Sequence, residues 1–143
     1  MNTVIGDLLK VKRGIICHQV NCKYVMGAGL AAQIRKAYPE HYSDYMSRYA
    51  HLGGLCITQI NSDLYVIGIY GQDSYGRNGL YTDYAALEKG LRSVSIFAKE
   101  KGLPIYLPFG IGCGLAGGDW QIVSNIIDRV ASDAIVLKKS SKN

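Results

Sequence analysis

Short apolar runs alternate along this chain with longer segments of helical pattern, and the alternation predicts the order of its elements. Residues 14–20 (GIICHQV) form a nearly continuous apolar run with one histidine, which is typical of a strand buried on both faces. Shorter β-rich runs at residues 3–5, 56–60, 64–70, 104–108 and 133–137 predict five more strands. Asn61, Ser62 and Asp63 separate two of these runs and predict a hairpin.

Helical patterns fill the intervals between these runs. Residues 81–101 place Tyr84, Leu87, Leu91, Val94 and Ala98 on one helical face, and Gly102 should end that helix. We also expect helices over residues 29–38, ended by Pro39, over residues 40–52, and after Asp119 as N-cap. Amphipathic helices between strands predict a layered α/β fold, and the hairpin makes its sheet mixed.

Composition narrows the classes of protein that fit. A length of 143 residues, with 48% hydrophobic and 19% charged residues, predicts one globular domain. We take residues 1–137 as that domain and residues 138–143 as a basic tail with Lys138, Lys139 and Lys142. There is no signal peptide pattern, no run of about 18 apolar residues and no C-x-x-C pair among the cysteines. We therefore expect a cytoplasmic monomer with reduced thiols, no membrane contact, no metal and no cofactor.

Two glycine-rich loops carry the main functional signal. Residues 21–29 (NCKYVMGAG) and 109–118 (FGIGCGLAGG) each lie between a buried strand and a helix. Such a turn exposes backbone N–H groups at the positive end of a helix dipole, so two of them could hold the two phosphates of a dinucleotide-like ligand. The alternative is that these glycines only make tight turns. Neither loop is a P-loop or a Rossmann fingerprint.

Three polar residues near the predicted strand ends have both a structural and a functional interpretation. His18 could be a hydrogen-bonded core histidine, or an acid, base or phosphate ligand. Asp7 could cap the turn after the first strand or accept a hydrogen bond from an exocyclic amine such as that of adenine. Asn21 could form a turn or hold a ribose hydroxyl. We expect His41 and His51 to lie at the surface.

A polar loop over residues 71–80 (GQDSYGRNGL) could be a lid or a disordered bend, and its Asp73 is a weaker candidate base. Beyond it, we expect Tyr84 to belong to the core. Trp120 should pack under the second glycine loop.

Four strings in register along nearly the whole chain resemble the macro domain family. They are residues 5–9 (IGDLL), 18–31 from HQVNC to MGAGLA, 69–84 from IYGQ to YTDY, and 107–120 from LP through GIGCGL to DW. The resemblance implies a three-layer α/β/α fold with a mixed central sheet and an ADP-ribose cleft over the strand ends. It implies that Asp7 and Leu8 bind near adenine and that Asn21 faces the distal ribose. The residues it assigns to the phosphates and ribose are Gly27, Ala28, Gly29 and Leu30, with Phe109, Gly110, Ile111, Gly112, Cys113, Gly114 and Leu115 opposite them.

Two enzymatic branches of that family look most similar. The glycohydrolase branch uses a lysine in the middle loop and an aspartate in the second glycine loop, but this chain has Gln72 within IYGQ and Ala116 after the Gly-Leu pair. The residues around His18, Asn21 and 31–45 resemble more closely the phosphatases that act on ADP-ribose 1″-phosphate. We therefore expect a phosphatase with His18, Asn21 and Asp73 as candidate catalytic residues. Positioning of the substrate and charge stabilisation should supply much of its rate enhancement.

Three other functions stay open at this point. The chain could remove ADP-ribose from a protein or nucleic acid, or it could be a reader or sponge that only binds ADP-ribose or a cyclic relative. An RNA-binding module would use the net charge of +5 and scattered tyrosines, but basic residues do not interleave with them as a stacking platform requires. We expect a small-molecule partner rather than nucleic acid.

Overall fold

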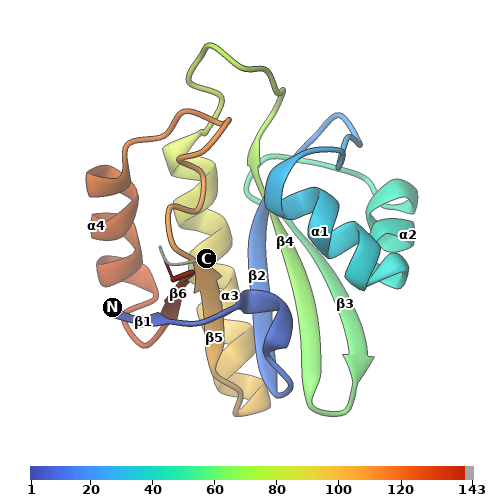
Figure 1. Ribbon diagram of the computed structural model, residues 1–143, viewed down its shortest axis with the longest axis vertical. Helices are drawn as coiled ribbons and strands as arrows, with labels where there is room; N and C mark the ends of the chain where they lie inside the picture. Colours follow the sequence, from blue (N-terminus) through green and yellow to red (C-terminus); the bar gives the residue numbers. More distant parts are fainter. Residues whose placement is uncertain (141–143) are drawn as a thin grey trace.

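One mixed sheet of six strands, in the order β1-β6-β5-β2-β4-β3, runs through the computed structural model, which describes residues 1–140 (Figure 1). The strands are β1 (Asn2–Ile5), β2 (Gly14–Asn21), β3 (Leu55–Asn61), β4 (Leu64–Gln72), β5 (Ile105–Pro108) and β6 (Ile135–Lys138). Neighbouring strands are parallel except for the β3–β4 hairpin. The predicted mixed sheet and its hairpin are therefore confirmed.

Helices cover both faces of this sheet. They are α1 (Gly29–Ala37), α2 (Pro39–Ser47), α3 (Tyr84–Lys101) and α4 (Trp120–Val130), with a 3-10 turn, η1 (Leu8–Lys10), after β1. Figure 1 shows α1 and α2 together at one side of the sheet, away from α3 and α4. Apolar side chains pack in separate clusters on the two faces, which completes the expected three-layer α/β/α arrangement.

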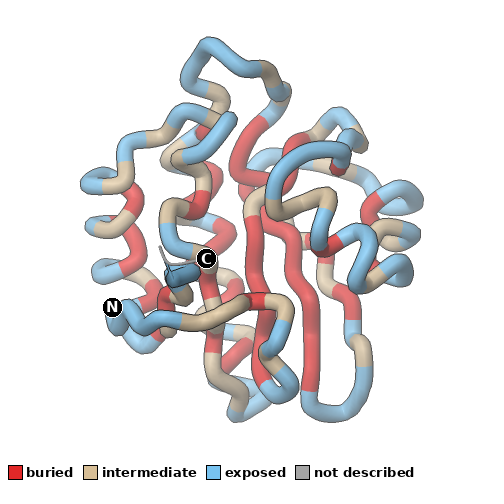
Figure 2. The backbone as a smooth tube through the Cα atoms, viewed as in Figure 1, coloured by how far each residue is buried: buried red, intermediate tan, exposed pale blue. Residues whose placement is uncertain are grey.

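The two faces of β2 explain why its sequence is almost continuously apolar. Ile15 and Cys17 pack into the cluster beneath α3 and α4, whereas Ile16 and Val20 pack on the α1 and α2 side. Because successive residues of a strand point to opposite faces, a strand covered on both sides needs apolar residues throughout. Figure 2 shows the same burial as long red stretches along β2 and β4.

Two helices have a boundary that differs from the expected one by more than one residue. The helix expected over residues 40–52 begins at Pro39 and ends at Ser47, because Arg48 takes up extended backbone angles. The long helix begins at Tyr84 rather than at residue 81, since the Asp83 carboxylate accepts a hydrogen bond from the Ala86 N–H and acts as the cap. The predicted Asp119 cap of α4 is confirmed, as its side chain accepts from Gln121 N–H.

The C-terminal end of the described chain is anchored by the sheet. Lys138, which the sequence analysis assigns to the tail, is the last residue of β6 and pairs with Ile5. Its ammonium lies 4.5 Å from the centre of the Phe109 ring. Lys142 of the predicted tail lies outside the described residues. In the part of the chain described, every helix is too short or too polar to cross a lipid bilayer.

Gly90 lets α3 approach β4 closely. A methyl group at this position would overlap Cγ2 of Ile69, and both residues are buried. We expect Gly90→Ala to destabilise the protein by about 1–3 kcal/mol, because the overpacking exceeds the gain in helix propensity. Urea unfolding should measure this change. Combining the substitution with Ile69→Ala should give less destabilisation than the sum of the two, and strict additivity would contradict the overlap.

Candidate functional site

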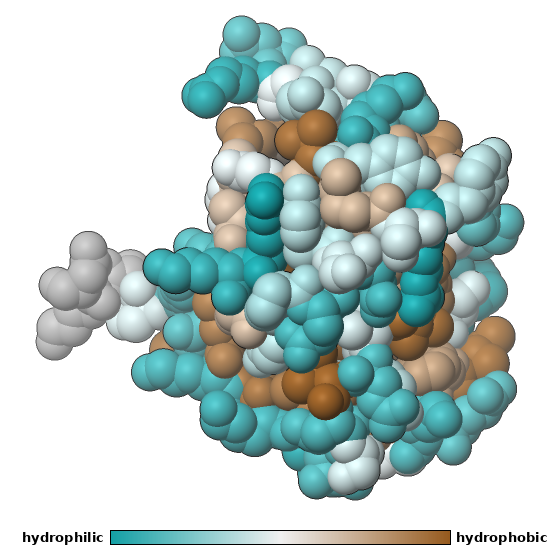
Figure 3. All heavy atoms as spheres, turned by 90° about the vertical axis from the view of Figure 1, so that its right-hand side faces the viewer, coloured by the Kyte–Doolittle hydropathy of each residue, from teal (hydrophilic) through white to brown (hydrophobic). Residues whose placement is uncertain are grey.

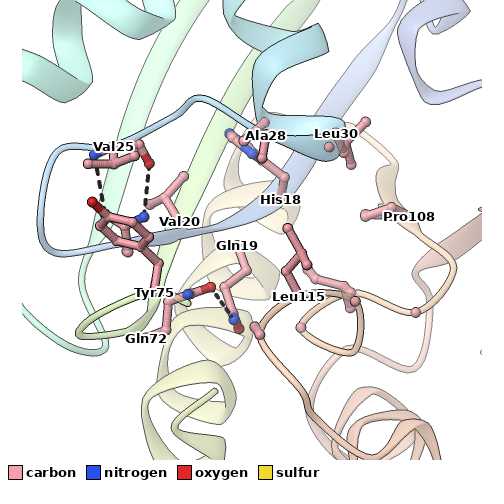
Figure 4. Close-up of a pocket in the computed structure, with 18 of the residues that line it drawn as sticks. His18, Gln19, Val20, Val25, Ala28, Leu30, Gln72, Tyr75, Pro108 and Leu115 are labelled. Carbon is pink, nitrogen blue, oxygen red and sulfur yellow. Dashed lines mark hydrogen bonds between the residues drawn. The ribbon is translucent and has the colours of Figure 1, made fainter. Parts of the chain in front are cut away.

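The carboxyl ends of β5, β2 and β4 meet at one edge of the sheet, since the three strands are adjacent and parallel. The segments that follow them surround a pocket of about 340 Å³ (Figure 4). Ligands of open α/β sheets bind at this kind of edge, where loops meet helix N-termini. The sheet topology thus brings together three segments that lie far apart in the sequence.

Both glycine-rich loops line this pocket, as their strand ends predict. The residues proposed from the sequence that form part of its wall are His18, Asn21, Gly27, Ala28, Gly29, Leu30, Phe109, Gly110, Ile111, Gly112, Gly114 and Leu115. The middle loop adds Tyr75 and Gly76 to the pocket wall. The two glycine loops therefore face one cavity.

Asn21 organises the first loop from inside. Its Oδ1 accepts hydrogen bonds from the backbone N–H groups of Lys23 and Val25 at 2.9 and 3.3 Å, and its Nδ2 donates to Val25 O at 2.8 Å. The Tyr45 hydroxyl lies 2.8 Å from the same Oδ1. These contacts confirm turn formation, the structural alternative for Asn21, while its catalytic role stays a prediction.

The first loop ends in a helix N-terminus without a side-chain cap. Ala28 is the N-cap residue of α1 and makes no capping hydrogen bond through a side chain. The first N–H groups of any helix lack partners inside the helix, so a cap, water or a ligand must accept from them. Since Gly29 and Leu30 line the pocket, this helix end presents N–H donors and positive dipole charge to a bound anion.

The second loop requires glycine at Gly117 and at two positions that line the pocket. Gly110 and Gly112 have φ angles of +77° and +76°, which side chains disfavour. Hydrogen bonds then hold the loop, since Cys113 N–H donates to Gly110 O at 2.8 Å and Gly118 N–H donates to Gly112 O at 2.9 Å. The backbone conformation of this loop is therefore held by contacts within the loop and does not depend on a ligand.

A glutamine network at the pocket floor was not proposed from the sequence. Gln19 Nε2 donates to Gln72 Oε1 and to Thr82 Oγ1, each at 2.9 Å, and Thr82 donates to Gly112 O at 2.6 Å. The network ties β2 and β4 to the second glycine loop, and Figure 4 shows the bond between Gln19 and Gln72. Gln19 Oε1 is buried and has no hydrogen-bond partner among the described residues. The sequence signal for this network was Gln19, a polar residue within an otherwise apolar strand.

His18 lies in the pocket wall, where it projects from β2 (Figure 4). Its side chain is 2% exposed, and its Nε2 lies 2.9 Å from Nε2 of His41. Nδ1 is buried and unpartnered among the described residues. Burial, and secondarily the neighbouring His41, hold the pKa of His18 well below its ordinary value, so the imidazole is neutral near pH 7.

The expectation that His41 lies at the surface is wrong. His41 is 0% exposed, because α2 turns this side chain towards the sheet, where it contacts both His18 and Thr58. Burial lowers its pKa to about 4, although Asp44 acts in the opposite direction. His51 is exposed, as expected.

Four of the residues proposed from the sequence are not part of the pocket wall. Asp7 accepts a hydrogen bond from Leu9 N–H at 3.0 Å, which confirms that it caps the turn after β1. Leu8 is buried in the apolar cluster that contains Ile16 and Ile34. Cys113 turns its thiol towards Ile111 O at 3.4 Å. Asp73 is exposed and lies 3.4 Å from the Lys23 ammonium. Their contacts with a ligand stay predictions.

The chemistry available in the pocket is narrow. Among the described residues of its wall, His18 and Tyr75 are the ones with titratable side chains. Residues 1–140 contain no group of three or more His, Cys, Asp or Glu side chains placed to hold a metal ion. A bound anion would therefore be held by N–H groups and helix dipole, with His18 as the candidate for proton transfer.

Comparison with known proteins places these features in context. A family model described as Macro domain matches residues 17–127. An uncharacterised 17.5 kDa protein of Enterobacteria phage T4 is 28% identical over 127 residues, which are 82% of this chain and 79% of that protein. A crystal structure from Bacteroides thetaiotaomicron superposes with a TM-score of 0.83 at 25% identity, covering 98% of this chain and 99% of that one. DarTG of Thermosipho africanus in complex with ADP-ribose gives 0.77 at 19% identity, covering 99% of this chain and 42% of that one.

Proposed function

Because the chain belongs to the macro domain family, we propose that its pocket binds ADP-ribose or a close derivative of it. The observation that carries this proposal is the uncapped N-terminus of α1 facing the glycine loop of residues 109–118 across one cavity. Backbone N–H groups from both sides would bind the diphosphate. The Thermosipho africanus protein of the same fold, which was solved with ADP-ribose, supports this ligand class.

The size of the pocket agrees with such a ligand. Its volume of about 340 Å³ lies at the lower end of the range common for small-molecule sites, roughly 300–1,000 Å³. Tyr75 is 53% exposed at the pocket wall and can cover a bound nucleotide. The same features support a reader or sponge, because binding alone needs no reactive group.

For the reaction, we propose hydrolysis of ADP-ribose 1″-phosphate to ADP-ribose and inorganic phosphate. His18 is neutral and buried in the pocket wall, so it would act first as a general base and then, once protonated, as the acid. A water oxygen bonds to phosphorus, and the bond from phosphorus to O1″ breaks with its electron pair on oxygen. The proton that water loses passes to His18 and then to O1″.

A glycohydrolase that uses a lysine nucleophile has less support in this chain. The described pocket wall includes neither a lysine nor a carboxylate, and Ala116 occupies the position after Gly114 and Leu115. Asp73, the remaining acidic candidate, is exposed and paired with Lys23. Removal of ADP-ribose from a macromolecule would therefore have to use His18 or the substrate itself.

Phosphorus NMR tests binding and reaction together. With ADP-ribose 1″-phosphate, the protein should produce an inorganic phosphate signal, and His18→Ala should lower the rate at least about 100-fold while the diphosphate signals still shift on binding. Thr3→Ala, on the exposed edge strand β1, is the control and should leave the rate unchanged. Shifted signals without turnover would indicate a reader, which binds the ligand without hydrolysing it. Unshifted signals with both ADP-ribose and its phosphate would overturn the ligand assignment.

A further inference from the structure

A series of hydrogen-bonded polar side chains, which we call the relay, runs from the pocket to the exposed side of α2 and consists of His18, His41, Thr58 and Asp44. Nε2 of His18 lies 2.9 Å from Nε2 of His41, and Nδ1 of His41 lies 2.9 Å from the Thr58 hydroxyl. Thr58 in turn donates to Oδ2 of Asp44 at 2.6 Å. The relay joins β2, α2 and β3, and both histidines and Thr58 are at most 3% exposed.

The Asp44 carboxylate, at the outer end, sets the direction of every hydrogen bond in the relay. The Thr58 hydroxyl donates to Oδ2 of Asp44, so its single proton is committed to that bond. The Thr58 oxygen must then accept from Nδ1–H of His41. A neutral His41 with its proton on Nδ1 has a lone pair on Nε2, so Nε2 of His18 must carry the proton between the two rings.

The consequence lies at the inner end. With its proton on Nε2, neutral His18 has a lone pair on Nδ1. This atom is buried in a residue of the pocket wall and has no hydrogen-bond partner among the described residues. An unpartnered buried polar atom costs roughly 1–3 kcal/mol, so Nδ1 is the ring atom of His18 that remains available to a group entering the pocket.

We propose that Asp44, Thr58 and His41 are positioning residues that hold His18 in its Nε2–H tautomer and leave Nδ1 to accept a proton or hydrogen bond from a ligand hydroxyl or attacking water. This inference rests on the proposed function for the identity of the ligand, and on the hydrogen-bond geometry alone for the tautomer. In this tautomer, Nδ1 of His18 accepts a hydrogen bond from the bound ligand or water. An imidazole of the opposite tautomer would present N–H to the same group.

The sheet leaves room for this arrangement at Gly68. Gly68 of β4 pairs with His18 of β2, and a methyl group there would lie 3.2 Å from both Val20 methyl carbons and 3.5 Å from Nε2 of His41. A side chain at this position would occupy the space in which the two histidines meet. Without it, α2 can place His41 directly against the strand.

The outer end of the relay is accessible to solvent. The side chain of Asp44 is 34% exposed and lies 3.6 Å from the Arg48 guanidinium on the same helix. Figure 3 views the molecule from the side on which Figure 1 draws α2, and hydrophilic residues predominate there, with brown groups scattered between them. This end of the relay therefore contacts solvent, while the two histidines are shielded from it.

Nitrogen NMR of the two rings tests the relay in the ligand-free protein. We expect His18 to show a protonated Nε2 and an unprotonated Nδ1 near pH 7. Thr58→Val keeps the shape but removes the hydroxyl, so both rings should become mixtures of tautomers, whereas Thr58→Ser should restore the original signals. Ile57→Val on the same strand is the matched control.

Activity supplies the second measurement. Thr58→Val should lower turnover of ADP-ribose 1″-phosphate at least about tenfold, the loss typical of removing an orienting partner, and Thr58→Ser should recover it. A proton on Nδ1 of His18 in the unaltered protein, or a Thr58→Val variant with unchanged tautomers, would overturn the relay. The predicted tautomer in a protein that leaves ADP-ribose unbound would uphold the relay and reject the proposed function.

Discussion

Phenylalanine at Gly27 or at Gly114 should abolish ADP-ribose binding while the protein stays folded. Both glycines line the pocket, one in each glycine loop, and an added Cβ would meet nothing within 4 Å at either position. Neither residue has a positive φ, so a side chain is compatible with the backbone. The aromatic ring would instead fill the cavity of about 340 Å³ that the ligand needs.

Titration calorimetry should show the loss. We expect the dissociation constant to rise at least 100-fold, about 2.7 kcal/mol, with a thermal midpoint close to that of the unaltered protein. Asn125→Phe places the same ring on the exposed side of α4, away from the pocket, and should bind normally. Unchanged binding by both glycine variants would show that the ligand lies elsewhere.

Acid should destabilise the protein steeply between about pH 6.5 and pH 4. Burial lowers the pKa of His41 from 6.5 to about 4 and that of His18 well below 6.5. In this interval the unfolded chain binds protons that the folded protein does not, so stability is complete above pH 6.5 and decreases as the pH falls. Each histidine should contribute a slope of up to about 1.4 kcal/mol per pH unit.

Urea unfolding at several pH values measures this slope. Replacing both buried histidines (His18→Gln and His41→Gln) should flatten it, because glutamine does not titrate. The exposed His51 is the matched control, and His51→Gln should leave the slope as it is. The charges nearest His41 are Asp44 and Arg48, whose effects on it oppose each other. A double variant that is as acid-sensitive as the unaltered protein would refute this origin.

Patterns that act over a few residues predicted most of the fold. Residues 14–20 are apolar because β2 is covered on both faces, and the periodicity around Leu87 and Leu91 marks the buried side of α3. The misplaced boundaries are those set by local hydrogen bonds: Asp83 caps α3 three residues later than expected, and α2 ends at Ser47. Such ends depend on where the chain must turn back to the sheet, which periodicity does not encode.

Local sequence patterns were sufficient to predict the layered α/β class, the mixed sheet and the two glycine loops of the pocket, since each depends on residues close together in the chain. Which polar side chains meet, by contrast, follows from the tertiary structure. It buried His41 against His18, joined Gln19 to Gln72 and Thr82, and left Asp73 outside the pocket wall. These contacts link residues 23 to 63 positions apart, and packing of helices and strands, rather than any local pattern, brings such residues together.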